Sequence, residues 1–283
     1  MNQELSTELV GDSYLPKENT FIRKTFPRIA FVSQDVTEGK GKTMKVTTEA
    51  GTFFTEKPTD ETDDKNKKIW THDEIGKSFE GIIFFTRKKL SYYDSAENAF
   101  ISSSYYDQDT DVVPLWSKGK KIAEGNKAQL QAPYMETKKD PKDPTKTKKV
   151  CTLAENKILY VYYQGEVFEL TIKGTSMYMY SAYYKDNNGE PNKNLTLISS
   201  VEDSNGATVW NKTTFKRVRQ LTQEEWDITR ALAKDMIDGI AEEKKYFSSM
   251  NTDVPALEAR VEEDWSPDLP KINVPILADG AEM

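Results

Sequence analysis

Residues 157–184, KILYVYYQGEVFELTIKGTSMYMYSAYY, form the clearest apolar and aromatic run in an otherwise polar chain. The run divides at Gln164 and Gly165, a pair suited to a tight turn, into two segments that each alternate with a period of two residues. This pattern predicts a β-hairpin with one plain core face. The side chains expected on that core face are Leu159, Val161, Tyr163, Phe168, Leu170 and Ile172. The reverse face mixes rings with polar groups, and it is either a binding surface or the far side of a sheet.

Composition indicates a globular protein. The chain has 283 residues, of which 37% are hydrophobic and 30% are charged, and this length can build one large β-rich domain or two smaller ones. No apolar run approaches the roughly 18–20 residues of a membrane helix, and the N-terminus lacks the basic and apolar regions of a secretion signal. The single cysteine, Cys151, excludes an internal disulfide and suits a reducing compartment. We therefore expect a cytoplasmic protein without a membrane partner, in the host cytoplasm if it is viral.

The net charge of −7 is unevenly spread along the chain. Residues 251–283 contain eight acids and two bases, a balance of −6, which leaves −1 for residues 1–250. An acidic protein is ordinarily a poor partner for nucleic acid. Here the acidity lies in the tail, so it does not argue against nucleic-acid binding by residues 1–250. We expect an N-terminal arm at 1–25, a single β-rich domain at 26–250, and an acidic, proline-containing tail at 251–283.

A second strong strand signal is 79-FEGIIFFTRKKLSYY-93. A turn at 94–98 is expected to lead into a further strand at 100–106, and residues 195–201 and 207–218 are expected to form a closing strand pair. The segment 136-ETKKDPKDPTKTKK-149 holds six lysines and no aliphatic residue, so we expect an exposed loop between strands.

The long helix expected in this chain runs from Thr222 to about Phe247. Thr222 and Glu225 have the spacing of a capping box, in which each side chain satisfies an orphan backbone amide. An apolar stripe repeats every four residues on this helix, at Ile228, Leu232, Met236 and Ile240. The stripe predicts that the helix packs on the sheet.

The sequence lacks the residues of the common catalytic and metal sites. His72 is the only histidine, so neither a Cys/His zinc site nor a Cys–His couple has its usual ligands. Asp107, Asp109 and Asp111 begin like a calcium loop, but Val112 and Lys118 stand where that loop needs glycine and glutamate. We expect a protein that is not an enzyme and that uses no metal or cofactor.

Aromatic rings interleaved with bases on predicted strands are the positive signal for function. Single-stranded nucleic acid is commonly held by a basic groove with rings on which bases stack. The residues with these side chains at same-face spacing are Phe85, Arg87, Lys89, Tyr93, Tyr160, Tyr162 and Lys173. The lysines of 138–149 would add phosphate contacts. Strands also favour Tyr and Phe for packing alone, so a structural role for these rings stays open.

The order of these features resembles phage-type single-stranded DNA-binding proteins built on an oligonucleotide/oligosaccharide-binding (OB) barrel. The matching parts are FEGIIFFTRKKLSYY, KILYVYYQGEVFELTIKGTS and the tail ending VEEDWSPDLPKINVPILADGAEM, although this tail lacks a dense acidic cluster and a terminal aromatic residue. The resemblance implies a mainly β protein with an antiparallel OB-like barrel, long loops, one long C-terminal helix and an acidic tail that recruits replication proteins. It implies a non-catalytic role on single-stranded DNA in phage DNA replication or recombination.

Two other functions stay open at this point. The chain is alternatively a structural or assembly protein of a virion that binds no nucleic acid, with its aromatic side chains in the core and its tail as a docking arm. The third hypothesis is an enzyme with a carboxylate–metal site around residues 107–111.

Overall fold

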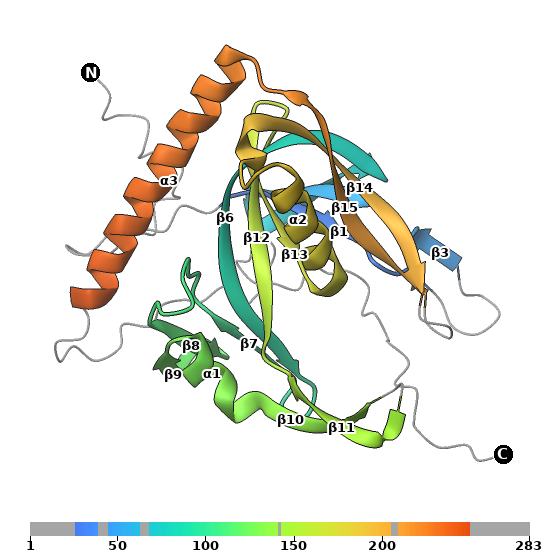
Figure 1. The fold of residues 1–283 in the computed structure, drawn as a ribbon, viewed down its shortest axis with the longest axis vertical. Coiled ribbons are helices and arrows are strands. Elements are labelled where there is room, and N and C mark those ends of the chain that lie inside the picture. Colours follow the sequence, from blue (N-terminus) through green and yellow to red (C-terminus); the bar gives the residue numbers. More distant parts are fainter. Residues whose placement is uncertain (1–25, 39–44, 63–67, 141–142, 205–208, 250–283) are drawn as a thin grey trace.

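The computed structural model describes residues 26–38, 45–62, 68–140, 143–204 and 209–249 (Figure 1). The predicted N-terminal arm and acidic tail lie outside these residues. The described chain is mainly β, as predicted. Its strands are β1 (Arg28–Phe31), β2 (Val36–Glu38), β3 (Lys45–Thr48), β4 (Phe53–Thr62), β5 (Lys68–Gly76), β6 (Ser78–Asp94), β7 (Ala99–Ser103), β8 (Val113–Ser117), β9 (Lys120–Gly125), β10 (Met135–Asp140), β11 (Asp143–Cys151), β12 (Ala154–Tyr163), β13 (Glu166–Ile172), β14 (Asn194–Ser204) and β15 (Val209–Gln220). Its helices are α1 (Lys127–Gln131), η2 (Ala132–Tyr134), α2 (Gly174–Asp186), η3 (Pro191–Lys193) and α3 (Gln223–Ser249).

One large sheet contains most of the strands and follows the order β5-β4-β1-β13-β12-β6-β7-β8-β9. The long strand β6 is its organising element, because it pairs with β14 near its start, with β12 along its middle and with β7 at its end. In Figure 1, β6 and β12 run side by side as curved strands through the molecule, with α3 along one side and a lobe of β7, β8, β9 and α1 at the lower end. Strands β10 and β11 form a separate two-stranded ribbon.

The predicted hairpin is confirmed. Strands β12 and β13 pair in register, with Leu159 opposite Leu170 and Tyr163 opposite Glu166. The two-residue turn has Gln164 at φ 50° and Gly165 at φ 86°. A two-residue turn with positive φ at both positions matches the twist of the strands, and glycine adopts such a φ without steric cost.

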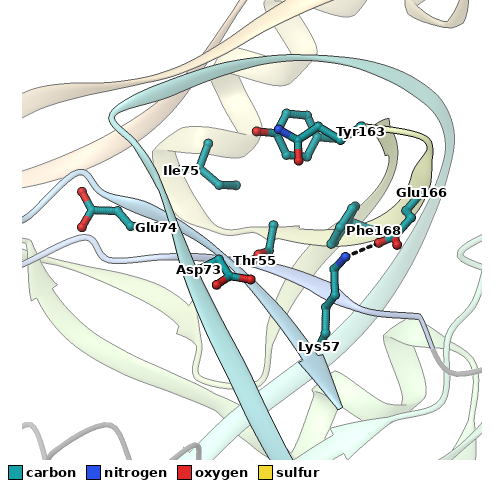
Figure 2. Close-up of a pocket in the computed structure, with 9 residues that line it drawn as sticks. Thr55, Lys57, Asp73, Glu74, Ile75, Tyr163, Glu166 and Phe168 are labelled. Atoms are coloured by element: carbon teal, nitrogen blue, oxygen red, sulfur yellow. Dashed lines mark ion pairs between the residues drawn. The ribbon is translucent and has the colours of Figure 1, made fainter. Parts of the chain in front are cut away.

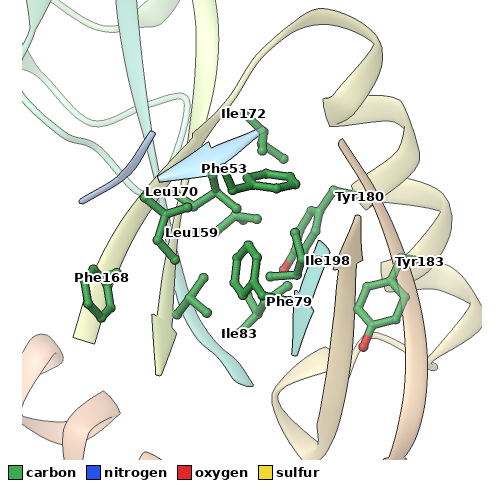
Figure 3. Close-up of a cluster of buried hydrophobic side chains, with 12 residues drawn as sticks. Phe53, Phe79, Ile83, Leu159, Phe168, Leu170, Ile172, Tyr180, Tyr183 and Ile198 are labelled. Carbon is green, nitrogen blue, oxygen red and sulfur yellow. The ribbon is translucent and has the colours of Figure 1, made fainter. Parts of the chain in front are cut away.

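The predicted core face of this hairpin forms the centre of the main core (Figure 3). Leu159, Leu170 and Ile172 are buried together with Phe79 and Ile198 from β6 and β14. Helix α2 closes this core through Tyr180 and Tyr183, which lie in a stretch whose sequence was compatible with either a strand or a short helix. Both rings meet Phe215 of β15, so α2, which follows β13 in the sequence, packs on β15.

The sheet does not close into the predicted barrel. The physical reason is that β13 pairs with β1, in parallel, so the sheet continues outward through β1, β4 and β5. The expectation of a purely antiparallel sheet was therefore wrong at this pair. Strand β15 meets the chain just after β1 through one backbone hydrogen bond, from the N–H of Asn211 to the carbonyl of Ser33 at 2.9 Å.

Helix α3 begins where the capping box placed it. The Glu225 carboxylate accepts from the Thr222 N–H at 2.8 Å, and the Thr222 hydroxyl accepts from the Glu225 N–H at 3.2 Å. Leu232 and Met236 of the predicted stripe pack against the sheet, whereas Ile228 is 38% exposed. The packed face is thus rotated from the predicted one and includes the buried Thr229.

A second core lies in the lower lobe, where Leu90 of β6 packs with Ile101, Leu115 and Leu153. The segment 136–149 is not the loop predicted from its composition. It forms most of the β10–β11 ribbon, in which Thr137 pairs with Lys149. Backbone pairing between two polar strands leaves no apolar signal in the sequence, which is why composition missed it.

Candidate nucleic-acid interface

Strand β6 carries a bulge that decides which of its side chains face outward. Phe85 pairs with Tyr160 and Ile83 pairs with Val161, so Phe84 is an extra residue in β6. Beyond the bulge, alternation places Phe85, Arg87, Lys89 and Tyr93 on the outer face of the sheet, away from the main core. The predicted same-face grouping of these four residues is therefore present in the structure.

The upper part of this outer face is covered. We call Phe85, Arg87, Tyr160 and Tyr162 the covered face. Tyr160 is 2% exposed and meets the Phe26 ring edge-to-face at 5.4 Å, and the Phe85 ring lies 6.0 Å away. Phe85, Tyr162 and the α3 side chains Leu232, Ala233 and Met236 all pack against this buried cluster. While Phe26 and α3 lie over it, Tyr160 offers no surface on which a base can stack.

Arg87 ties α3 to the covered face. It is 5% exposed, and its guanidinium donates to Glu243 of α3 at 2.8 Å, to Asp107 at 3.1 Å and to the Tyr105 carbonyl at 3.2 Å. Burial alone would lower the pKa of Arg87, but the charge and hydrogen bond of Glu243 and the charge of Asp107 together raise it above its usual value. Lys244 of α3 adds a 3.6 Å ion pair with Asp107. Arg87 is thus committed to packing α3 rather than to a phosphate.

Lys89 marks the lower limit of the covered face. Its ammonium lies 5.3 Å from the centre of the Tyr105 ring, in cation–π contact. The Tyr105 hydroxyl in turn donates to Glu169 of β13 at 2.8 Å. Lys89 is only half-buried, so its charge remains near solvent.

Below Lys89 the same outer face is open. Tyr93 pairs directly with Phe100 across β6 and β7, and these rings are 55% and 53% exposed. In the next row, Ser102 of β7 pairs with Trp116 of β8, which is half-buried and pairs with the exposed Lys121 of β9. We call Lys89, Tyr93, Phe100, Trp116 and Lys121 the hairpin face. On this strand surface three rings lie between two ammonium groups, and that of Lys121 is paired with Glu124 at 2.6 Å.

Six of the seven predicted site residues therefore separate into two groups. Phe85, Arg87, Tyr160 and Tyr162 lie on the covered face, while Lys89 and Tyr93 lie on the hairpin face. Lys173 is exposed directly after β13, where it precedes α2. A nucleic-acid role for these residues stays a prediction.

Sequence reasoning missed Phe100 and Trp116 as members of the outer face. The predicted turn at 94–98 contained a usable signal for Phe100, because a hairpin closed by Asp94 and Ala99 places Tyr93 opposite Phe100. Trp116 gave no such signal, since its pairing depends on β7 and β8 together.

A polar hollow of about 320 Å³ lies beside the β12–β13 turn (Figure 2). Lys57 of β4 reaches across it to Glu166 at 2.5 Å, and Asp73 and Glu74 of β5 add two carboxylates to its wall. The one cation of this lining is already paired, and the remaining charges are negative. This hollow therefore disfavours phosphate and is not part of the candidate interface.

The three aspartates that begin like a calcium loop each meet cations or backbone amides of the protein. Asp107 binds Arg87, Asp109 lies 2.6 Å from Lys88, and Asp111 accepts two backbone N–H groups at 3.0 Å each. The hydrogen bond from Lys88 lowers the pKa of Asp109 below its usual value. Within the described ranges, no group of three or more His, Cys, Asp or Glu side chains is arranged to hold a metal ion.

Comparison of the chain with protein-family models, with curated proteins and with solved structures gives no match. Of the helices that the structure describes, none has both the length and the apolar character needed to cross a membrane.

Proposed function

We propose that this protein binds single-stranded DNA, without catalysis, through the hairpin face, and that it serves phage DNA replication or recombination. The observation that carries the proposal is the exposed pair of Tyr93 and Phe100 beside Lys89 on one strand face. Two adjacent open rings on the same strand face as an ammonium group four residues away supply the stacking and the charge that sequence-independent binding of single strands uses.

The connectivity of the strands supports the same function. Strand β6 pairs with both β12 and β14, β13 follows β12 in a hairpin, α2 lies between β13 and β14, and β15 pairs with β14. Five strands joined in this order have the connectivity of an OB fold, with β6 as its first strand. OB folds are often only partly closed, and they bind oligonucleotides on the face of the second and third strands and on the loops beside it.

In this correspondence, the segment 95–153 takes the place of the loop between the first two OB strands. That segment contains β7, β8 and β9, and thus Phe100, Trp116 and Lys121 of the hairpin face. The usual strand face is occupied by α3 and Phe26, so the loop segment is the part of the OB site that remains open. The proposed site is therefore displaced downward along β6 from Tyr160 toward Tyr93.

Fluorescence anisotropy with labelled oligo-dT and with duplex DNA, at about 50 mM and about 200 mM salt, tests this function. We expect binding that prefers the single strand and weakens with salt. The double variant Tyr93→Ala/Phe100→Ala should bind oligo-dT about a hundredfold more weakly, because each stacked base contributes on the order of 1–3 kcal/mol.

The matched control is Tyr178→Ala/Tyr184→Ala, which removes two exposed rings from α2, outside the hairpin face. It should bind like the wild type. Absence of binding by the wild type at low salt would overturn the proposal in favour of a structural or assembly protein. Metal-dependent hydrolysis of any substrate would overturn it in favour of an enzyme.

A further inference from the structure

The β10–β11 ribbon forms a sheet of its own. Within the described residues, β10 and β11 hydrogen-bond only to each other in the sheet pattern. The described side chains at 135–139 and 145–149 are all exposed. A two-stranded hairpin is marginally stable in water by itself, and this one places no apolar face against the body. Packing therefore gives no account of why the ribbon is present.

The register of the ribbon sets like charges against each other. Lys138 lies directly opposite Lys148, and Lys146 lies two residues further along β11 on the same face. Like charges directly opposite on a sheet are destabilising, whereas a glutamate in one of these positions would give a favourable pair. The glutamate that the ribbon does have, Glu136, lies opposite Val150 and forms a 3.2 Å ion pair with Lys138. Both faces of the ribbon thus carry more lysines than acids, since Lys139 and Lys149 lie on the face opposite to Lys138 and Lys148. The pairing of Lys138 with Lys148 is unfavourable to the ribbon's own stability.

The ribbon leaves the body near the end of β6, the strand that carries Tyr93 of the hairpin face. At its base, the Tyr134 ring packs against Tyr92, the neighbour of Tyr93, with ring centres 6.0 Å apart. Met135 pairs with Cys151, and the Thr152 N–H donates to the Tyr134 carbonyl at 2.9 Å. Figure 1 shows the ribbon extending from the lobe that carries β7, β8 and β9, on the opposite side of the molecule from the start of α3. Because successive strand residues point to opposite faces, Tyr92 and Tyr134 lie on the core side of β6, with Leu90, and Tyr93 lies on the other side. A strand bound on the hairpin face would therefore reach the ribbon around the end of β6.

We infer that the β10–β11 ribbon is a second contact site for the phosphate backbone of the same single strand, with Lys138, Lys146 and Lys148 as its cations. This inference rests on the proposed function and assigns base stacking and phosphate binding to two different surfaces. The hairpin face stacks bases, and the ribbon binds phosphates, whose negative charge relieves the repulsion between Lys138 and Lys148. The ribbon then contributes to affinity through release of counterions, and its contribution falls as salt rises.

The test is the salt dependence of oligo-dT binding by Lys138→Gln/Lys148→Gln. Each phosphate contact contributes about 0.7 to the slope of log K against log salt for single strands, so loss of two contacts should reduce the slope by about 1.4. At low salt, affinity should fall on the order of tenfold. Both lysines are exposed and mutually repulsive, so the variant should unfold at the wild-type temperature or slightly above it.

The matched control is Lys185→Gln/Lys234→Gln, which removes the same charge from exposed positions on α2 and α3. Its slope should stay at the wild-type value. A wild-type slope in the ribbon variant, or an equal loss of slope in both variants, would overturn this inference while leaving the stacking site intact. Failure of the wild type to bind oligo-dT at all would instead remove the proposed function, so the two failures are distinguishable.

Discussion

The covered face and the hairpin face are consecutive parts of one strand surface, yet they use the same residue types in opposite ways. Tyr160 and Arg87 are buried beneath Phe26 and α3, whereas Tyr93 and Phe100 stand open to solvent. Rings on the covered face hold two layers of the protein together, and the charge of Arg87 is neutralised inside that contact. Residue type and strand spacing therefore do not distinguish a packing surface from a binding surface. The two surfaces are distinguished by whether another part of the chain, such as α3, packs over the strand.

The comparison is tested most strongly by removing one ring from each face. Tyr160→Ala should lower the free energy of unfolding by about 3–5 kcal/mol, because it leaves a cavity in a packed cluster. Tyr93→Ala should cost about 1 kcal/mol, since an exposed cross-strand contact with Phe100 and an exposed hydrogen bond from its hydroxyl to Asn98 are lost. Urea unfolding followed by circular dichroism measures both values, and equal losses would contradict the division into two faces.

The next largest effect should come from two cations only two residues apart on β6. Arg87→Leu should destabilise the protein by about 3 kcal/mol, because it removes the guanidinium that donates to the buried Glu243 carboxylate and to Asp107. Lys89→Leu should cost less than about 1 kcal/mol, the scale of an exposed cation–π contact. If Arg87→Leu/Glu243→Leu recovers most of the lost stability, the penalty comes from the charge of Glu243, and no recovery would point to lost packing instead.

The smallest effect concerns the N-terminal end of α3, the helix that covers the upper face. The hydrogen bond from Arg219, with further bonds from Thr222, lowers the pKa of Glu225 from 4.5 to about 2. A lowered folded-state pKa stabilises the fold above the unfolded value, and this contribution is lost as pH falls from about 4.5 through about 2. At neutral pH, Glu225→Gln should lower Tm by about 2 °C. The difference from the wild type should disappear near pH 2, and a difference independent of pH would show that the charge is not involved.

Part of this fold could be predicted from the sequence because its signals are local. The alternation around Gln164 and Gly165 determined the hairpin, and the spacing of Thr222 and Glu225 determined where α3 begins. The parallel pairing of β1 with β13 could not be predicted, since it joins segments far apart and leaves no periodic signal. The β10–β11 ribbon could not be recognised in the sequence, because two polar strands that pair through their backbones leave no apolar pattern.

The candidate site was only partly predictable for a related reason. Periodicity showed that Arg87 and Tyr160 share a sheet face with polar groups, and it showed that α3 has a packing stripe. It did not show which of the two sheet faces α3 would choose. That choice depends on partners such as Glu243, which lies far along the chain from Arg87 and whose charge gave no hint of burial.

The pairing of β1 with β13 also has a consequence for how the protein is made. Arg28 is in register with Glu169, so β1 is synthesised long before the strand that pairs with it in parallel. At typical synthesis rates, the ribosome needs roughly 7–28 s to cover that interval. During this time β1 and β4 can pair as an antiparallel hairpin, but the other edge of β1 has no strand to bind. Contacts that span so much sequence also slow folding. One edge of β1 thus stays unpaired, and open to other chains, until the hairpin β12–β13 leaves the ribosome.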